Sequence, residues 1–203
     1  MQTDRLRAAG IAVIALLVLA GAAAQFLNYG LDLHVVALDA SGDGGAFGVV
    51  GQVALASAAL AAWSVLSRVR GWDVATAVLP LLLTFLAVDK ILRLHDDIAR
   101  WHLYYAPILL AAFVALVMAA RRLPAPNPRL VGHGLLMLSV AFLIHLSAKP
   151  VLHRLGVVQD SWTSQITGMA KHGAEVAGWL LVTLALTLSI RDLRPAGPPD
   201  AES

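Results

Sequence analysis

Residues 47–66 read FGVVGQVALASAALAAWSVL and contain no charged side chain. A helix needs about 20 mainly apolar residues to cross the hydrocarbon core of a bilayer, and this stretch has that length. Comparable apolar runs occupy residues 6–27, 74–94, 105–120, 130–152 and 169–190. The sequence therefore predicts an all-α polytopic bundle of about six transmembrane helices.

The composition agrees with a membrane protein that has almost no soluble part. Of its 203 residues, 59% are hydrophobic and 14% are charged, whereas soluble domains carry about 25% charged residues. We expect one transmembrane domain over residues 1–194, followed by a disordered, proline-containing tail at 195–203. The lack of cysteine excludes disulfides, thiol catalysis and iron–sulfur clusters, and a formal charge of +2 argues against a nucleic-acid partner.

The positions of the arginines predict the orientation in the membrane. Arginine stays on the cytoplasmic side of short loops, and nine arginines fall on one side of a six-span alternation: Arg5, Arg7, Arg68, Arg70, Arg121, Arg122, Arg129, Arg191 and Arg194. Both termini are therefore predicted to be cytoplasmic. Trp101, Tyr104 and Tyr105 fit an outer aromatic belt. The first run also fits a signal peptide, but we expect it to be retained as a span.

Ionisable side chains from three predicted spans gather towards the outer face: Asp89, His95, Asp96, His145, His172 and Glu175. Such a group inside a bilayer costs about 2.5 kcal/mol or more, so it needs a partner or a role. Imidazole and carboxylate are common ligands of zinc, iron and manganese. The predicted ligands of such a metal are Asp89, His95, His145, His172 and Glu175. Asp96 is the predicted catalytic base.

Plainer interpretations of the same residues stay open. Asp89 and Arg93, Arg93 and Asp97, and Asp96 and Arg100 are each four residues apart, a spacing that suits intrahelical salt bridges. Further histidines fit the interface between membrane and water better than a ligand set: His34, His102 and His153. These spacings therefore leave an alternative to the metal site, in which the ionisable side chains only stabilise the structure.

The segments FLAVD at 85–89, LHD at 94–96 and HxxExxG at 172–178 resemble a widespread group of poorly characterised bacterial multi-span proteins. The resemblance covers residues 81–188 and departs at Lys90 and His172, where that group carries acidic residues. It implies a multi-pass protein of the bacterial cytoplasmic membrane and no particular activity. The chain is also similar, more weakly, to the alkaline-ceramidase-like membrane hydrolases, in which histidines and an aspartate hold zinc; their paired C-terminal histidines are absent here.

Several functions fit this cluster. A metal ion with bound water would make the chain a hydrolase of a lipid or another amphiphile. The same side chains would also serve a proton- or ion-coupled transporter, with His145 titrating near neutral pH. His145 and His172 fit the axial ligands of a b-haem, and an accessory subunit of a larger complex would use the cluster for structure alone. The sequence leaves open whether the protein is an enzyme and whether it forms oligomers; its expected partners are the bilayer and a lipid or small-molecule substrate.

Overall fold

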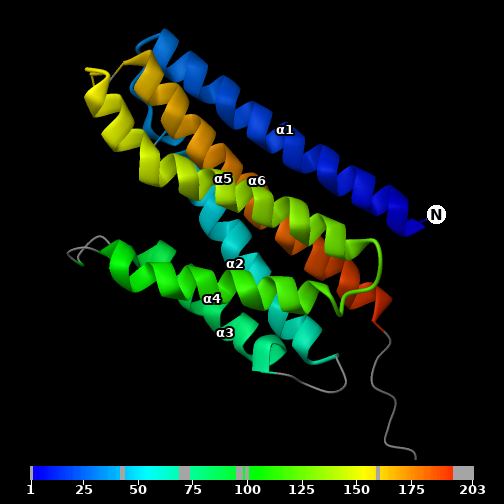
Figure 1. Cartoon of the computed structure of the whole chain (residues 1–203). Helices are drawn as coiled ribbons and strands as arrows, with labels where there is room; N and C mark the ends of the chain where they lie inside the picture. The colour runs from blue at the N-terminus through cyan, green and yellow to red at the C-terminus, as the bar shows by residue number, and fades with distance from the viewer. Residues whose placement is uncertain are drawn as a thin grey trace, which may run out of the picture. The chain divides into compact units, whose positions relative to one another are not determined.

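The computed structural model describes residues 2–41, 44–68, 74–94, 98, 101–158 and 161–193, without the side chains at 75, 76, 101, 102 and 149. These residues form helices and no strand, which confirms the all-α prediction. The elements, drawn in Figure 1, are α1 (Gln2–Gly30), the short 3-10 helix η1 (Val36–Leu38), α2 (Ala46–Leu66), α3 (Val74–Leu92), α4 (Trp101–Ala120), α5 (Asn127–Arg154) and α6 (Trp162–Asp192). The predicted tail at 195–203 lies outside the described residues.

Five of the described helices are long and apolar enough to cross a membrane: Gln2–Gly30, Ala46–Leu66, Leu103–Ala120, Asn127–Arg154 and Trp162–Asp192. An α-helix rises about 1.5 Å per residue, so about 20 residues match a hydrocarbon core of about 30 Å. Large apolar side chains of α1 are exposed, among them Leu16 and Leu19, as expected for a surface whose solvent is lipid. The chain is therefore a membrane-embedded helical protein. The helix predicted at 74–94 is also formed, as α3.

The chain divides into two compact units. Unit 1 contains Met1–Ala54 and His133–Val182, and unit 2 contains Leu55–Gly132 and Thr183–Ser203. Helices α2, α5 and α6 contribute residues to both units. The single domain expected over residues 1–194 stays a prediction.

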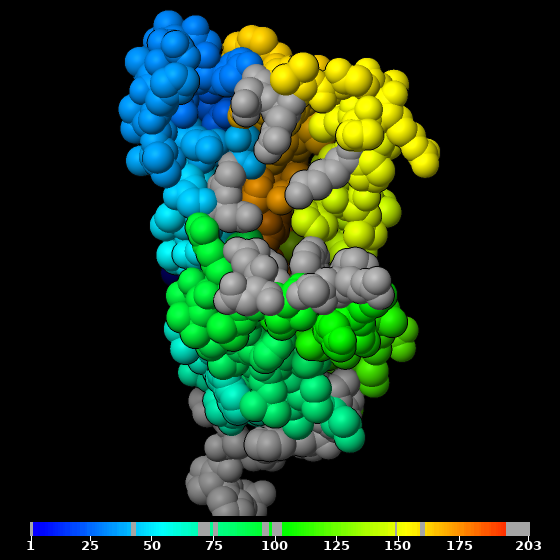
Figure 2. All heavy atoms as spheres, turned by 90° about the vertical axis from the view of Figure 1, so that its left-hand side faces the viewer, coloured from blue at the N-terminus to red at the C-terminus, as the bar shows by residue number. Residues whose placement is uncertain are grey.

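In unit 1, α6 lies between α1 and α5, as the orange segment between blue and yellow ones in Figures 1 and 2. Small residues allow these helices to approach closely. A Cβ atom added to Gly178 of α6 would lie 2.9 Å from the carbonyl oxygen of Gly134 in α5. One added to Gly21 of α1 would lie 2.0 Å from the Phe47 ring, which belongs to the buried core of this unit. Close packing of this kind is how helices associate in lipid, where apolar burial gives little driving force.

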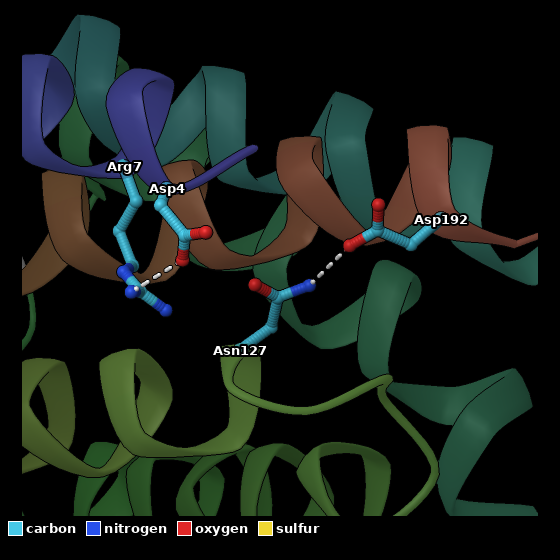
Figure 3. A network of polar contacts seen from close by, with 4 residues as sticks. All are labelled: Asp4, Arg7, Asn127 and Asp192. Carbon is cyan, nitrogen blue, oxygen red and sulfur yellow. Dashed lines mark hydrogen bonds and ion pairs between the residues drawn. The ribbon is translucent and has the colours of Figure 1, made fainter. Parts of the chain in front are cut away.

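In unit 2, α3 and α4 form an antiparallel pair next to the second half of α2. The indole nitrogen of Trp63 in α2 donates to the Thr84 hydroxyl of α3 at 3.1 Å. Figure 3 shows the side-chain amide of Asn127, at the start of α5, donating to Asp192 at the end of α6.

The same figure shows a separate contact in unit 1, within the first turns of α1, where Arg7 donates to Asp4 at 2.9 Å.

Candidate functional site

His172 and Glu175 of α6 form the part of the predicted site that lies within one element. A spacing of three residues puts both side chains on one side of the helix. The His172 Nδ1 atom lies 3.7 Å from the Glu175 Oε2 atom, and the His172 side chain is only 4% exposed, against 23% for Glu175. Unit 1 therefore buries an imidazole beside a carboxylate within a membrane-spanning helix.

The distance between these two atoms bears on what the pair can do. At 3.7 Å it exceeds the usual donor–acceptor distance of about 2.7–3.2 Å for an N–H···O hydrogen bond. A tetrahedral metal ion with bonds of about 2.1 Å holds two ligand atoms about 3.4 Å apart. The separation is thus close to that of two ligands on one ion.

His145 is the remaining predicted ligand in unit 1, and its side chain on α5 is half-buried. It follows Gly134 by about three helical turns, which places it on the α5 face that contacts α6. Within the part of the chain that the structure describes, no three His, Asp or Glu side chains are grouped as a complete metal site would require. His95 and Asp96 lie outside the described residues, so a set that includes either of them is not tested.

Asp89 belongs to unit 2, where its partner is a residue that the site prediction did not include. The Tyr105 hydroxyl of α4 donates to Asp89 Oδ1 at 2.6 Å, and both residues are buried. The Tyr105 ring also packs against Phe85 of α3, with centroids 6.0 Å apart. Since His145, His172 and Glu175 belong to unit 1, convergence of Asp89 with them stays a prediction.

Two of the aromatic residues predicted to lie in the outer belt, Tyr104 and Tyr105, differ in their exposure. Tyr104 is 63% exposed, in agreement with a side chain at the surface, whereas Tyr105 is 6% exposed and turned towards Asp89. The placement of Tyr105 in the belt is therefore wrong. No spacing within one helix would have found this contact, because it joins side chains of two helices, α3 and α4.

A second polar network in unit 1 also escaped the sequence analysis. The Gln25 side chain of α1 is 4% exposed. Its Nε2 atom donates to Gln165 of α6 at 2.8 Å, and its Oε1 atom accepts from the Ala40 backbone N–H at 2.5 Å. Nearby, Asn28 accepts from the Val35 backbone N–H at 2.8 Å. These bonds hold residues 31–41 against α1 and link α1 to α6. The sequence signal for them was a pair of polar residues, three positions apart, within an apolar run.

The histidines assigned to the interface are exposed where the structure describes their side chains. His34 and His153 are both exposed, and His34 Nε2 lies 3.1 Å from Asp32 Oδ1. Of the predicted salt bridges, those with Asp96, Asp97 and Arg100 fall outside the described residues.

No model of a known protein family matches the chain, and no match is found among curated proteins or solved structures. Both resemblances stated above therefore stay expectations.

Proposed function

We propose that the chain is a multi-pass protein of the bacterial cytoplasmic membrane that binds one divalent transition metal at His172 and Glu175. The observation that carries the proposal is the His172–Glu175 pair, in which the imidazole is buried, the carboxylate is half-buried and the two nearest ligand atoms lie 3.7 Å apart. A neutral imidazole and a carboxylate are the ligands that zinc, iron and manganese share. A bound ion would also offset the cost of holding a carboxylate inside the membrane.

The other ligands come from the residues predicted by the sequence. His145 of α5 is the sequence-based candidate in unit 1, although the described residues do not group it with His172 and Glu175. Asp89 and His95 are the candidates from the third span, and water fills any position that the protein leaves open.

This ligand set supports a hydrolytic function. A divalent ion lowers the pKa of bound water to about 7, which supplies hydroxide at neutral pH. Asp96 would then take the proton from this water. A site within membrane-spanning helices is reached from the bilayer, so the proposed substrate is a lipid or another amphiphile with a bond that water can cleave.

Metal content tests the proposal directly. We expect the purified protein to contain about one zinc, iron or manganese ion per chain, and chelation to lower its melting temperature, because a ligand that binds only the folded state stabilises it. His172→Ala and Glu175→Ala should each remove both the ion and the effect of the chelator. His153→Ala, at an exposed position on α5, is the matched control and should change neither.

Two results would argue against a metal-dependent hydrolase. The metal-binding proposal would be contradicted by a protein that contains no metal and whose melting temperature is unchanged by chelator or by added zinc, iron or manganese. An intense Soret band in the visible spectrum, lost in His145→Ala and His172→Ala, would instead indicate a b-haem with these two axial ligands.

A proton-coupled carrier is the second candidate, and the Asp89–Tyr105 bond favours it. A buried carboxylate that accepts from a phenol at 2.6 Å is a pair through which a proton can pass, and ionisable residues inside membranes often form such relays. Proton flux into proteoliposomes that is lost in Asp89→Asn would support the carrier. Flux equal in Asp89→Asn and wild type would count against it.

A further inference from the structure

Unit 2 carries a basic segment between two membrane-spanning helices. Residues 121–129 read RRLPAPNPR and connect the end of α4 to the first turn of α5; we call them the basic turn. Arg121, Arg122 and Arg129 are all exposed. Arg191, in the last turn of α6, is exposed as well. Cationic side chains thus dominate this end of unit 2.

The basic turn has a defined conformation. Backbone N–H groups of Arg122 and Asn127 donate to Ala119 and Pro124 at 2.9 and 3.0 Å. The Asn127 amide donates to Ser189 at 3.0 Å and to Asp192 at 3.2 Å, which fixes the start of α5 beside the end of α6. Arg129 follows Asn127 by two residues and Arg191 directly precedes Asp192, so both exposed arginines lie within one helical turn of these bonded residues.

A hollow of about 360 Å³ lies in the basic turn, lined by Ala125, Pro126, Pro128 and Arg129. Its wall is apolar except for Arg129, and proline has no backbone N–H to donate. Since α4 and α5 are both long and apolar enough to cross a membrane, we expect the segment that joins their ends to lie at the depth of the lipid headgroups. The surface therefore combines an apolar wall with cationic groups at the boundary of the bilayer.

We propose that the basic turn binds the headgroup region of an anionic phospholipid. The phosphate and its neighbouring negative charge would lie against Arg121, Arg129 and Arg191, while the glycerol and upper acyl carbons occupy the hollow. The N-terminus of α5 adds a partial positive charge that favours an anion at the same place. Basic residues immediately outside membrane spans attract anionic lipid, and each raises the affinity by about fivefold. This site is independent of the proposed metal site, since it shares no residue with the candidate metal ligands.

Lipid binding to the purified full chain tests the proposal. Native mass spectrometry from a neutral detergent would measure retention of phosphatidylglycerol, with phosphatidylcholine as the zwitterionic comparison. We expect phosphatidylglycerol to bind at least about tenfold more tightly, and Arg121→Gln/Arg129→Gln to lower its affinity by about tenfold or more. The Arg121→Lys/Arg129→Lys protein keeps both charges and should retain most of the affinity.

The matched control is Arg93→Gln/Arg154→Gln, which removes the same charge from two exposed positions elsewhere and should bind phosphatidylglycerol as the wild type does. Three outcomes would overturn the proposal. These are equal binding of the two lipids, equal losses in the two double glutamine variants, and competition by inorganic phosphate or glycerol phosphate at the concentration of the lipid. The last result would show a site for a soluble anion.

Discussion

Asp89 shows what a single residue requires inside a membrane-spanning protein. Asp89 is 5% exposed, and its Oδ1 atom accepts a hydrogen bond from the Tyr105 hydroxyl at 2.6 Å. Hydrogen bonds to a charged group contribute about 1.5–3 kcal/mol, and a buried acceptor that loses its donor costs a similar amount. The Tyr105 hydroxyl should therefore contribute to folding as well as to any chemistry at Asp89.

Replacing Tyr105 with phenylalanine removes this donor and leaves the ring. We expect Tyr105→Phe to lower the free energy of unfolding by about 1–3 kcal/mol, measured by thermal or denaturant unfolding in detergent micelles. Tyr104→Phe is the control, because that side chain is 63% exposed and should change stability by less than about 0.5 kcal/mol. Equal stability of the two variants would mean that the Tyr105–Asp89 bond is not formed in the membrane protein.

The same residues show how far a candidate site can be predicted from sequence. The spacing of His172 and Glu175 on one helix predicted their proximity, and the structure places them 3.7 Å apart. The Tyr105–Asp89 and Gln25–Gln165 contacts join different helices, and no local spacing encodes which faces of two helices meet. Contacts within an element are therefore accessible from sequence, whereas contacts between elements need the packing arrangement.

At the scale of elements, the apolar runs predicted the helices better than their ends. The sixth run was placed at 169–190, while α6 begins at Trp162. The extra residues include Thr163, Ser164 and Gln165. Because they are polar, they lower the mean hydropathy, and the predicted apolar run therefore begins after them. Their backbone hydrogen bonds continue regardless, because an unpaired backbone group near the membrane is costly. Hydropathy thus measures the apolar part of a helix and underestimates its length.

Close packing between α5 and α6 depends on glycine. Gly178, which has atoms close by, and Gly132, which has none within 4 Å, provide a test. A Cβ atom at Gly178 would lie 2.6 Å from Leu138 Cγ and 2.9 Å from the Gly134 carbonyl oxygen. Since a backbone atom cannot turn aside, the helices must separate. We expect Gly178→Ala to lower the melting temperature, with a loss of about 1–3 kcal/mol typical of overpacking.

Gly132→Ala is the matched control on α5. Nothing lies within 4 Å of the added Cβ atom, and alanine favours a helix over glycine by about 1 kcal/mol. The melting temperature of Gly132→Ala should equal or exceed that of the wild type. If both alanine variants were equally stable, close contact at Gly178 would not be part of the folded protein.

At the scale of the whole molecule, the positions of the arginines predict which loops lie on each side of the membrane. In unit 1, the Tyr29 ring contacts the Trp162 ring with centroids 4.4 Å apart, so residues 31–41 and 155–158 lie at the same end, away from Arg7 at the start of α1. In unit 2, Arg68 donates to the Ile190 carbonyl at 2.6 Å, and this end also carries the basic turn. Basic residues are retained in the cytoplasm during insertion. The loops of unit 1 named here are accordingly predicted to be external.

Single introduced cysteines test this topology, because the natural chain has none and each label then reports one position. Val36→Cys and Val158→Cys occupy sites that are 68% and 72% exposed in the two predicted external loops, and Ala125→Cys occupies an exposed site in the basic turn. With a membrane-impermeant maleimide on intact bacteria that have a permeable outer membrane, the first two should react and Ala125→Cys should react only after lysis. The opposite pattern would reverse the orientation. It would also move the basic turn to the external leaflet, where the predicted attraction to anionic lipid on the cytoplasmic side no longer applies.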